Sequence, residues 1–151
     1  MSYLELDARL SAAQEVGYPE VELPDIQGKK VKLSEVDAKV IMVYFWSATD
    51  ANQKMFNLDV LKSLYDDYHK RGFEIYQVAL DPDKVSWAQV VKQQNLPWIN
   101  VCDSRGAASP YTALYNISSV PAVYVICNGD LVDGSMADEK SFRKTLDNLL
   151  K

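Results

Sequence analysis

Residues 39–68, KVIMVYFWSATDANQKMFNLDVLKSLYDDY, predict a strand that turns sharply into a helix. Residues 40–46 are a nearly continuous apolar run rich in β-formers, which is typical of a strand covered on both faces. The turn follows at residues 47–49, and the helix is expected to begin near Asp50. Because unpaired N–H groups gather at a helix start, this turn is the first candidate for chemistry.

The helix after the turn carries a broad apolar stripe, which predicts that one face packs against the sheet. The sequence Arg71-Gly72 indicates its end, since glycine commonly closes a helix. The stripe consists of Met55, Leu58, Leu61, Leu64, Tyr65 and Tyr68.

Strands alternate with helices along the rest of the chain, which predicts one α/β domain with a partly parallel sheet. Upstream, residues 21–33 indicate an edge hairpin around Gln27-Gly28 or two short strands, and Ser34 is a candidate cap for a helical turn. Asn128-Gly129 predicts a late hairpin. The expected downstream elements are strand 73–80, helix 84–94, strand 98–101, helix 111–115, strands 122–127 and 130–133, and helix 138–150.

Residues 3–16 predict a separate peripheral helix. We therefore divide the chain into an N-terminal helix, residues 1–18, and a domain of residues 19–151. The N-terminal helix could be the end of an upstream region of a longer chain.

The composition excludes some partner classes. A net charge of −5, without long runs of like charge, argues against nucleic acid and against an anionic membrane surface. The chain contains no apolar stretch of about 18 residues and no signal segment at its start, so direct membrane insertion is not expected.

Two motifs resemble the thioredoxin superfamily, most closely the TlpA-like and AhpC/TSA-like thiol–disulfide proteins of bacterial cell envelopes. They are Tyr44-Phe45-Trp46-Ser47-Ala48 before a helix, and Ser119-Val120-Pro121-Ala122 before a strand. Pro24-Asp25 and the segment Gly28–Ser34 are similar to the N-terminal hairpin of these proteins. The resemblance covers roughly residues 19–151. It implies a thioredoxin-like fold, with a mixed central sheet flanked by helices and a cis-proline loop at Val120-Pro121.

The chain departs from this family at the redox motif, which is typically Cys-x-x-Cys. Asp50 stands where the first cysteine belongs, Gln53 where the second belongs, and Thr49 replaces the usual tryptophan. Disulfide exchange needs one thiolate to attack and a second thiol to resolve the mixed disulfide. The resemblance therefore implies a degenerate site that has lost this activity and serves as a binding or structural module.

Two interpretations of the degenerate site are open. Asp50 can be a simple helix cap, paired with Gln53 in a capping box, and the cis proline can be kept for fold geometry alone. Alternatively, a groove survives and holds a protein or extended peptide. By resemblance, that groove would consist of Trp46, Thr49, Asp50, Ala51, Asn52, Gln53, Val120 and Pro121.

The enzymatic alternative is a thiol-dependent oxidoreductase or antioxidant-type enzyme of the same superfamily that uses Cys102. The only other cysteine, Cys127, is expected at the end of its strand remote from the turn. We do not expect these two residues to lie close enough for a disulfide.

No cofactor and no metal site is predicted. His69 is the sole histidine and is expected at a helix end, and Asp81 and Asp83 are interpreted as turn and cap residues. There is no glycine-rich phosphate loop. By resemblance, the compartment is the periplasm or cell envelope, although this chain carries no signal segment.

Overall fold

The computed structural model describes residues 17–132 and 138–151. The helix predicted over residues 3–16 and the last residue of the strand predicted over 130–133 lie outside the described residues. The elements are β1 (Glu22–Pro24), β2 (Lys30–Lys32), η1 (Leu33–Glu35), β3 (Val40–Trp46), α2 (Ala51–Phe56), η2 (Asn57–Leu61), α3 (Lys62–Tyr68), η3 (His69–Arg71), β4 (Phe73–Ala79), α4 (Lys84–Gln94), β5 (Ile99–Cys102), η4 (Gly106–Ala108), α5 (Pro110–Leu114), β6 (Ala122–Cys127), β7 (Asp130–Val132) and α6 (Glu139–Leu149).

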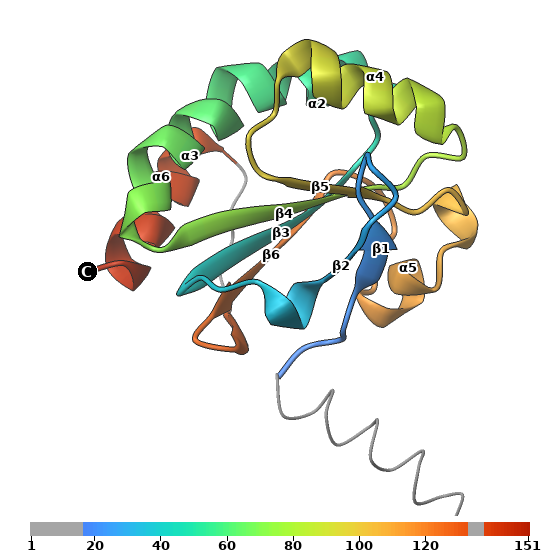
Figure 1. Ribbon diagram of the computed structural model, residues 1–151. Helices are drawn as coiled ribbons and strands as arrows, with labels where there is room; N and C mark the ends of the chain where they lie inside the picture. The colour runs from blue at the N-terminus through green and yellow to red at the C-terminus, as the bar shows by residue number, and fades with distance from the viewer. Residues whose placement is uncertain (1–16, 133–137) are drawn as a thin grey trace, which may run out of the picture.

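A five-stranded mixed sheet in the order β5-β4-β3-β6-β7 forms the centre of the molecule (Figure 1). β3 is parallel to β4, and β4 is parallel to β5. β6 runs antiparallel to β3, and β7 runs antiparallel to β6 around the Asn128-Gly129 turn. The predicted α/β fold with a late antiparallel hairpin is therefore confirmed. β3, which leads into the turn of interest, is the central strand.

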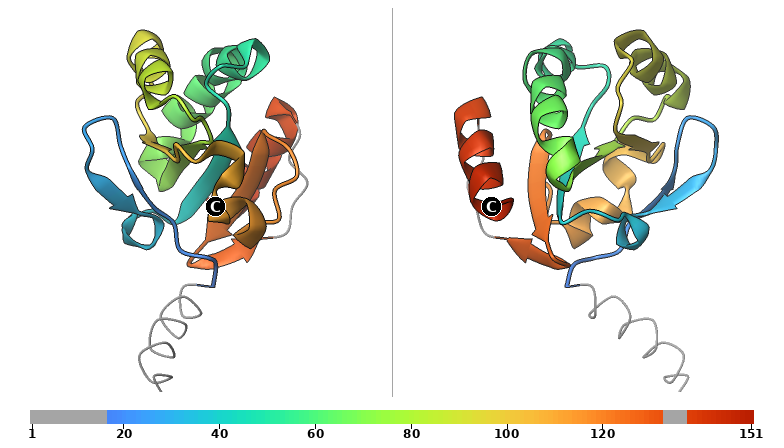
Figure 2. Two further views of the ribbon diagram at one scale, coloured as in Figure 1. Left: turned by 90° about the vertical axis from the view of Figure 1, so that its right-hand side faces the viewer. Right: turned by 60° about the vertical axis from the view of Figure 1, so that its left-hand side comes forward.

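The two faces of β3 belong to two separate cores, because successive side chains of a strand point to opposite faces. Tyr44 and Trp46 lie on the face covered by α2, α3, α4 and α6, whereas Val43 and Phe45 face the β1–β2 hairpin and α5 (Figures 1 and 2). All seven residues of β3 are buried, as the apolar run predicts.

Tyrosine hydroxyls fasten the N-terminal hairpin region to the sheet. Tyr76 donates to the Val31 carbonyl at 2.7 Å, and Tyr115 donates to the Pro19 carbonyl. The predicted helical turn is present as η1, but its predicted cap is wrong. Ser34 lies inside the turn, and its hydroxyl donates to the carboxylate of Glu20.

The helix after β3 contains a wider π-helical turn, η2. A π-turn rotates the residues before it relative to a uniform α-helix, so a stripe predicted at 3.6 residues per turn fails there. Met55 and Leu58 were predicted to face the core, yet they are 52% and 41% exposed. Gln53 and Asn57 are buried in their place. The part of the stripe after the π-turn is buried as predicted.

A chain of mostly buried amide groups holds α2 and η2 against β4 and α4. Trp98 Nε1 donates to Gln77 Oε1, and Gln77 Nε2 donates to Asn57 Oδ1, both at 2.8 Å. Asn57 Nδ2 donates to Gln94 Oε1, and Gln94 Nε2 donates to the Lys54 carbonyl, both at 3.0 Å. Because these groups satisfy one another, the network fixes the position of α2 and of its first turn.

Candidate functional site

Asp50 caps α2, as predicted. Its backbone is extended, and its carboxylate accepts a hydrogen bond from the Gln53 N–H at 3.0 Å. The reciprocal half of the predicted capping box is wrong. Gln53 Oε1 accepts from the Ser47 N–H at 2.8 Å, because the inward rotation of this residue carries its side chain under the turn.

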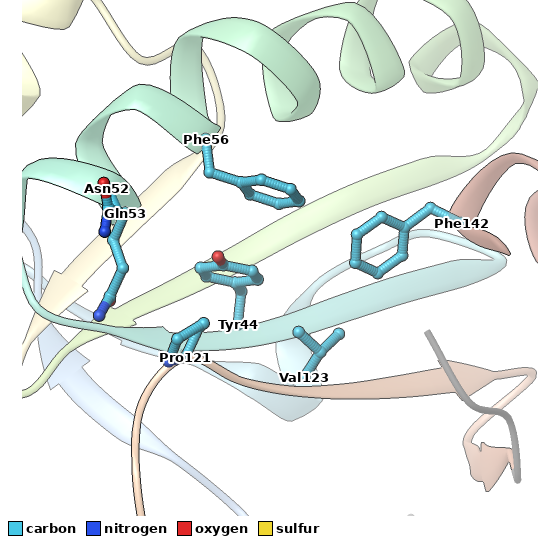
Figure 3. Close-up of a pocket in the computed structure, with 7 residues that line it drawn as sticks. All are labelled: Tyr44, Asn52, Gln53, Phe56, Pro121, Val123 and Phe142. Atoms are coloured by element: carbon cyan, nitrogen blue, oxygen red, sulfur yellow. The ribbon is translucent and has the colours of Figure 1, made fainter. Parts of the chain in front are cut away.

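The Val120–Pro121 peptide bond is cis, as predicted. Gln53 links this loop to α2, since Gln53 Nε2 donates to the Val120 carbonyl at 3.5 Å. In Figure 3 Gln53 and Pro121 lie next to each other at one side of a pocket. The structure thus joins the strand–helix turn to the cis-proline loop through the side chain at the second motif position.

Asp81 holds the turn between β3 and α2 through hydrogen bonds, a role that the sequence did not reveal. It is 3% exposed, and its carboxylate accepts from the Ala48 N–H at 2.8 Å and from the Ser47 hydroxyl at 3.0 Å. Asp83 caps α4, as predicted, by accepting from the N–H groups of Val85 and Ser86. The Asp81 carboxylate thus holds the turn after β3, and the Asp83 carboxylate holds the first turn of α4.

A pocket of about 400 Å³ opens beside Gln53 and Pro121 (Figure 3). Of the predicted groove residues, Asn52, Gln53 and Pro121 line it. Trp46 does not, because it is completely buried in the core. The residues lining the pocket that the sequence did not suggest are Tyr44, Phe56, Val123 and Phe142.

The other predicted groove residues lie around this pocket without lining it. Thr49 and Ala51 are exposed at the turn, and Asp50 is half-buried at the helix start. Val120 lines a second hollow of about 290 Å³ together with Leu80. The cis-proline loop therefore has one hollow at Val120 and another at Pro121.

Comparison with known proteins identifies the family. The sequence model of the AhpC/TSA family matches residues 16–133. The chain belongs to this family. Among curated relatives, thiol-disulfide oxidoreductase ResA of Oceanobacillus iheyensis is 28% identical over 108 residues, which are 71% of this chain and 54% of the relative. ResA of Bacillus cereus is 23% identical over 108 residues, 72% of this chain and 60% of the relative. The chain thus spans little more than half the length of these relatives.

Solved structures agree with the thioredoxin-like fold. A thioredoxin-like protein from Bacteroides vulgatus superposes with a TM-score of 0.74 at 32% identity, covering 89% of this chain and 86% of that one. A thiol-disulfide oxidoreductase from Bacteroides fragilis superposes with a TM-score of 0.77 at 26% identity, covering 88% of this chain and 99% of that one. The predicted membership of the thioredoxin superfamily is therefore confirmed.

The two cysteines of this AhpC/TSA-family chain lie far from each other. Cys102 on β5 pairs with Ala79 on β4, and Ala79 pairs with Trp46 at the end of β3. Cys127 on β6 pairs with Val40, at the start of β3. Three strand spacings of about 4.8 Å and six residues of about 3.3 Å separate them. A disulfide needs Cα atoms within about 7 Å, so these two residues cannot form one in this fold.

Cys102 does not have the surroundings of a reactive thiol. It is 4% exposed, and its Sγ donates to the Asp81 carbonyl at 3.6 Å. Burial raises the pKa of the Cys102 thiol to about 11, whereas nucleophilic cysteines have a lowered pKa and an accessible sulfur. The structure therefore gives no support to the alternative of an enzyme that uses Cys102.

The described residues contain no group of three or more histidine, cysteine or acidic side chains placed to hold a metal ion. His69 lies in the last turn of its helix, as predicted, 3.7 Å from Glu74. Within the described ranges, no helix is both long enough and apolar enough to cross a membrane.

Proposed function

We propose that this chain is a thioredoxin-like domain that no longer exchanges disulfides and binds a protein or extended peptide beside its cis-proline loop. One observation carries the proposal. The side chains of Asp50 and Gln53, at the two motif positions, both hold the backbone of the site together through hydrogen bonds. The positions that would carry electrons in the family are thus used to preserve the shape of the site.

The open space beside these residues supports binding over a purely structural role. The pocket reaches both Gln53 and Pro121, and Asn52 adds an exposed amide at its rim. If the cis-proline loop served the fold alone, nothing would require a pocket next to it. A partner could contact the pocket and the exposed turn together.

The same family membership supports a place in the bacterial cell envelope. Because the chain spans little more than half of its ResA relatives, their activity is not transferred to it. Binding of a partner by the shared thioredoxin-like frame is the role that we propose.

Insulin reduction with dithiothreitol as electron source tests the loss of disulfide exchange. We expect the rate with this chain to equal the rate without protein, because neither motif position offers a thiolate. A ResA protein serves as the positive control, and the Cys102→Ser/Cys127→Ser variant as the thiol-free control. Turnover that survives in that variant would contradict the proposal. Turnover that disappears in it would favour the Cys102 enzyme instead.

A further inference from the structure

Tyr44 forms part of the floor of the pocket, and its hydroxyl lies on the side of the ring that faces α2 (Figure 3). The residue as a whole is 1% exposed. No group in the described part of the chain hydrogen-bonds this hydroxyl. This hydroxyl is not among the fully buried unpartnered atoms of the described residues, so it opens onto the pocket, where a ligand can accept its hydrogen bond.

The walls of the pocket are aromatic. The rings of Tyr44 and Phe56 lie nearly parallel, with centroids 6.2 Å apart and an interplanar angle of 9°. Phe142 of α6 meets Phe56 edge-on, with centroids 6.0 Å apart. Aromatic groups prefer offset-stacked or edge-on neighbours, and this pocket offers both kinds of surface. Its volume of about 400 Å³ lies within the usual range of small-ligand sites.

The polar groups of the pocket are neutral. None of its seven lining residues is charged. Burial raises the pKa of Tyr44 well above the usual range, which keeps the phenol protonated and able to donate. A charged ligand would lose its hydration without gaining an ionic partner, which is strongly unfavourable.

We infer that this pocket takes an uncharged aromatic group bearing a hydrogen-bond acceptor, which accepts from the Tyr44 hydroxyl while its ring packs against Phe56 and Phe142. The inference rests on the proposed function and specifies the anchor of the bound partner. An aromatic residue of a peptide supplies this chemistry through its ring and a nearby backbone carbonyl. A free aromatic carbonyl compound supplies it as well.

Titration of the ¹⁵N-labelled chain, followed by NMR, tests the inference with matched probes. Acetophenone carries a ring and an acceptor, ethylbenzene lacks the acceptor, and benzoate adds a charge. We expect acetophenone to bind more tightly than both, with amide shifts centred on Asn52, Gln53 and Val123. N-acetyl-phenylalaninamide distinguishes the sources. If N-acetyl-phenylalaninamide binds more tightly than acetophenone, the natural ligand is an aromatic residue of a peptide. If it binds more weakly, the natural ligand is a free aromatic compound.

The Tyr44→Phe variant removes only the hydroxyl. We expect its affinity for acetophenone to fall roughly threefold to tenfold, the usual effect of one lost hydrogen bond, with its affinity for ethylbenzene unchanged. Tyr124→Phe is the matched control, because Tyr124 lies on the opposite face of the sheet, and its affinities should match those of the wild type.

Three results would overturn the inference: equal affinity for acetophenone and ethylbenzene, an unchanged acetophenone affinity in Tyr44→Phe, or shifts centred on the hollow beside Val120. Each would leave the absence of insulin reduction standing. Insulin reduction by the wild type would instead contradict the proposed function, without altering the preference of the pocket for acetophenone over ethylbenzene and benzoate. The two failures are therefore distinguishable.

Discussion

The double variant Asp50→Cys/Gln53→Cys is expected to reduce insulin at least about tenfold faster than the wild-type chain, because it restores an attacking and a resolving thiol. Positions 50 and 53 are the N-cap and third residue of α2. Residues three apart on a helix have Cβ atoms about 5–6 Å apart, close to the reach of a disulfide. The helix start supplies the N–H groups and dipole that lower a thiol pKa.

The Cys102→Ser/Cys127→Ser background removes the native thiols from this comparison. On it, the single variants Asp50→Cys and Gln53→Cys serve as matched controls, since each lacks one partner of the pair and should not turn over. Loss of the cap and of the Gln53 bonds should cost about 1–3 kcal/mol, so circular dichroism must first show that the double variant is folded. A folded double variant without turnover would contradict our view that the frame of the site is intact.

Replacing Gln77 by leucine should lower the free energy of unfolding by about 2–5 kcal/mol, which urea unfolding would measure. Gln77 is fully buried, and its amide bonds both Trp98 and Asn57. Leucine has a similar volume but leaves two side-chain atoms unpaired, Trp98 Nε1 and Asn57 Oδ1. The loss therefore reports the penalty for two unsatisfied polar groups rather than for a cavity.

Gln89→Leu is the matched control for this substitution. Gln89 lies on the exposed side of α4, where the same change should alter the free energy of unfolding by no more than about 0.5 kcal/mol. If Gln77→Leu were as mild as Gln89→Leu, the amide network would not be what fixes α2 on the sheet.

The fold could be predicted from local signals in the sequence that tertiary packing leaves unchanged. The apolar run of β3 has the predicted bounds, Gly72 ends its helix with a φ of 103°, and Asn128 and Gly129 both adopt positive φ in the hairpin turn. Each signal depends on a property of the residue itself: β-propensity for the strand, and tolerance of the left-handed region for the turns.

The site could be predicted less well, because it depends on contacts between distant segments. Periodicity assumes a uniform helix, and the π-turn at Asn57–Leu61 breaks that assumption. It exposes Met55 and turns Gln53 toward Val120. A tyrosine at the centre of a buried strand, Tyr44, was the one signal that could have indicated the pocket. Its significance depends on Phe142, which lies about a hundred residues later in the chain.

The most direct test of a lost redox couple is the thiol state of the wild-type chain after equilibration with varied ratios of oxidised to reduced dithiothreitol. Acid quenching, denaturation and alkylation, followed by intact mass measurement, count the free thiols. We expect Cys102 and Cys127 to stay reduced at every ratio, since β4 and β3 separate their strands. A disulfide between them that forms and is reduced as the ratio changes would contradict this account.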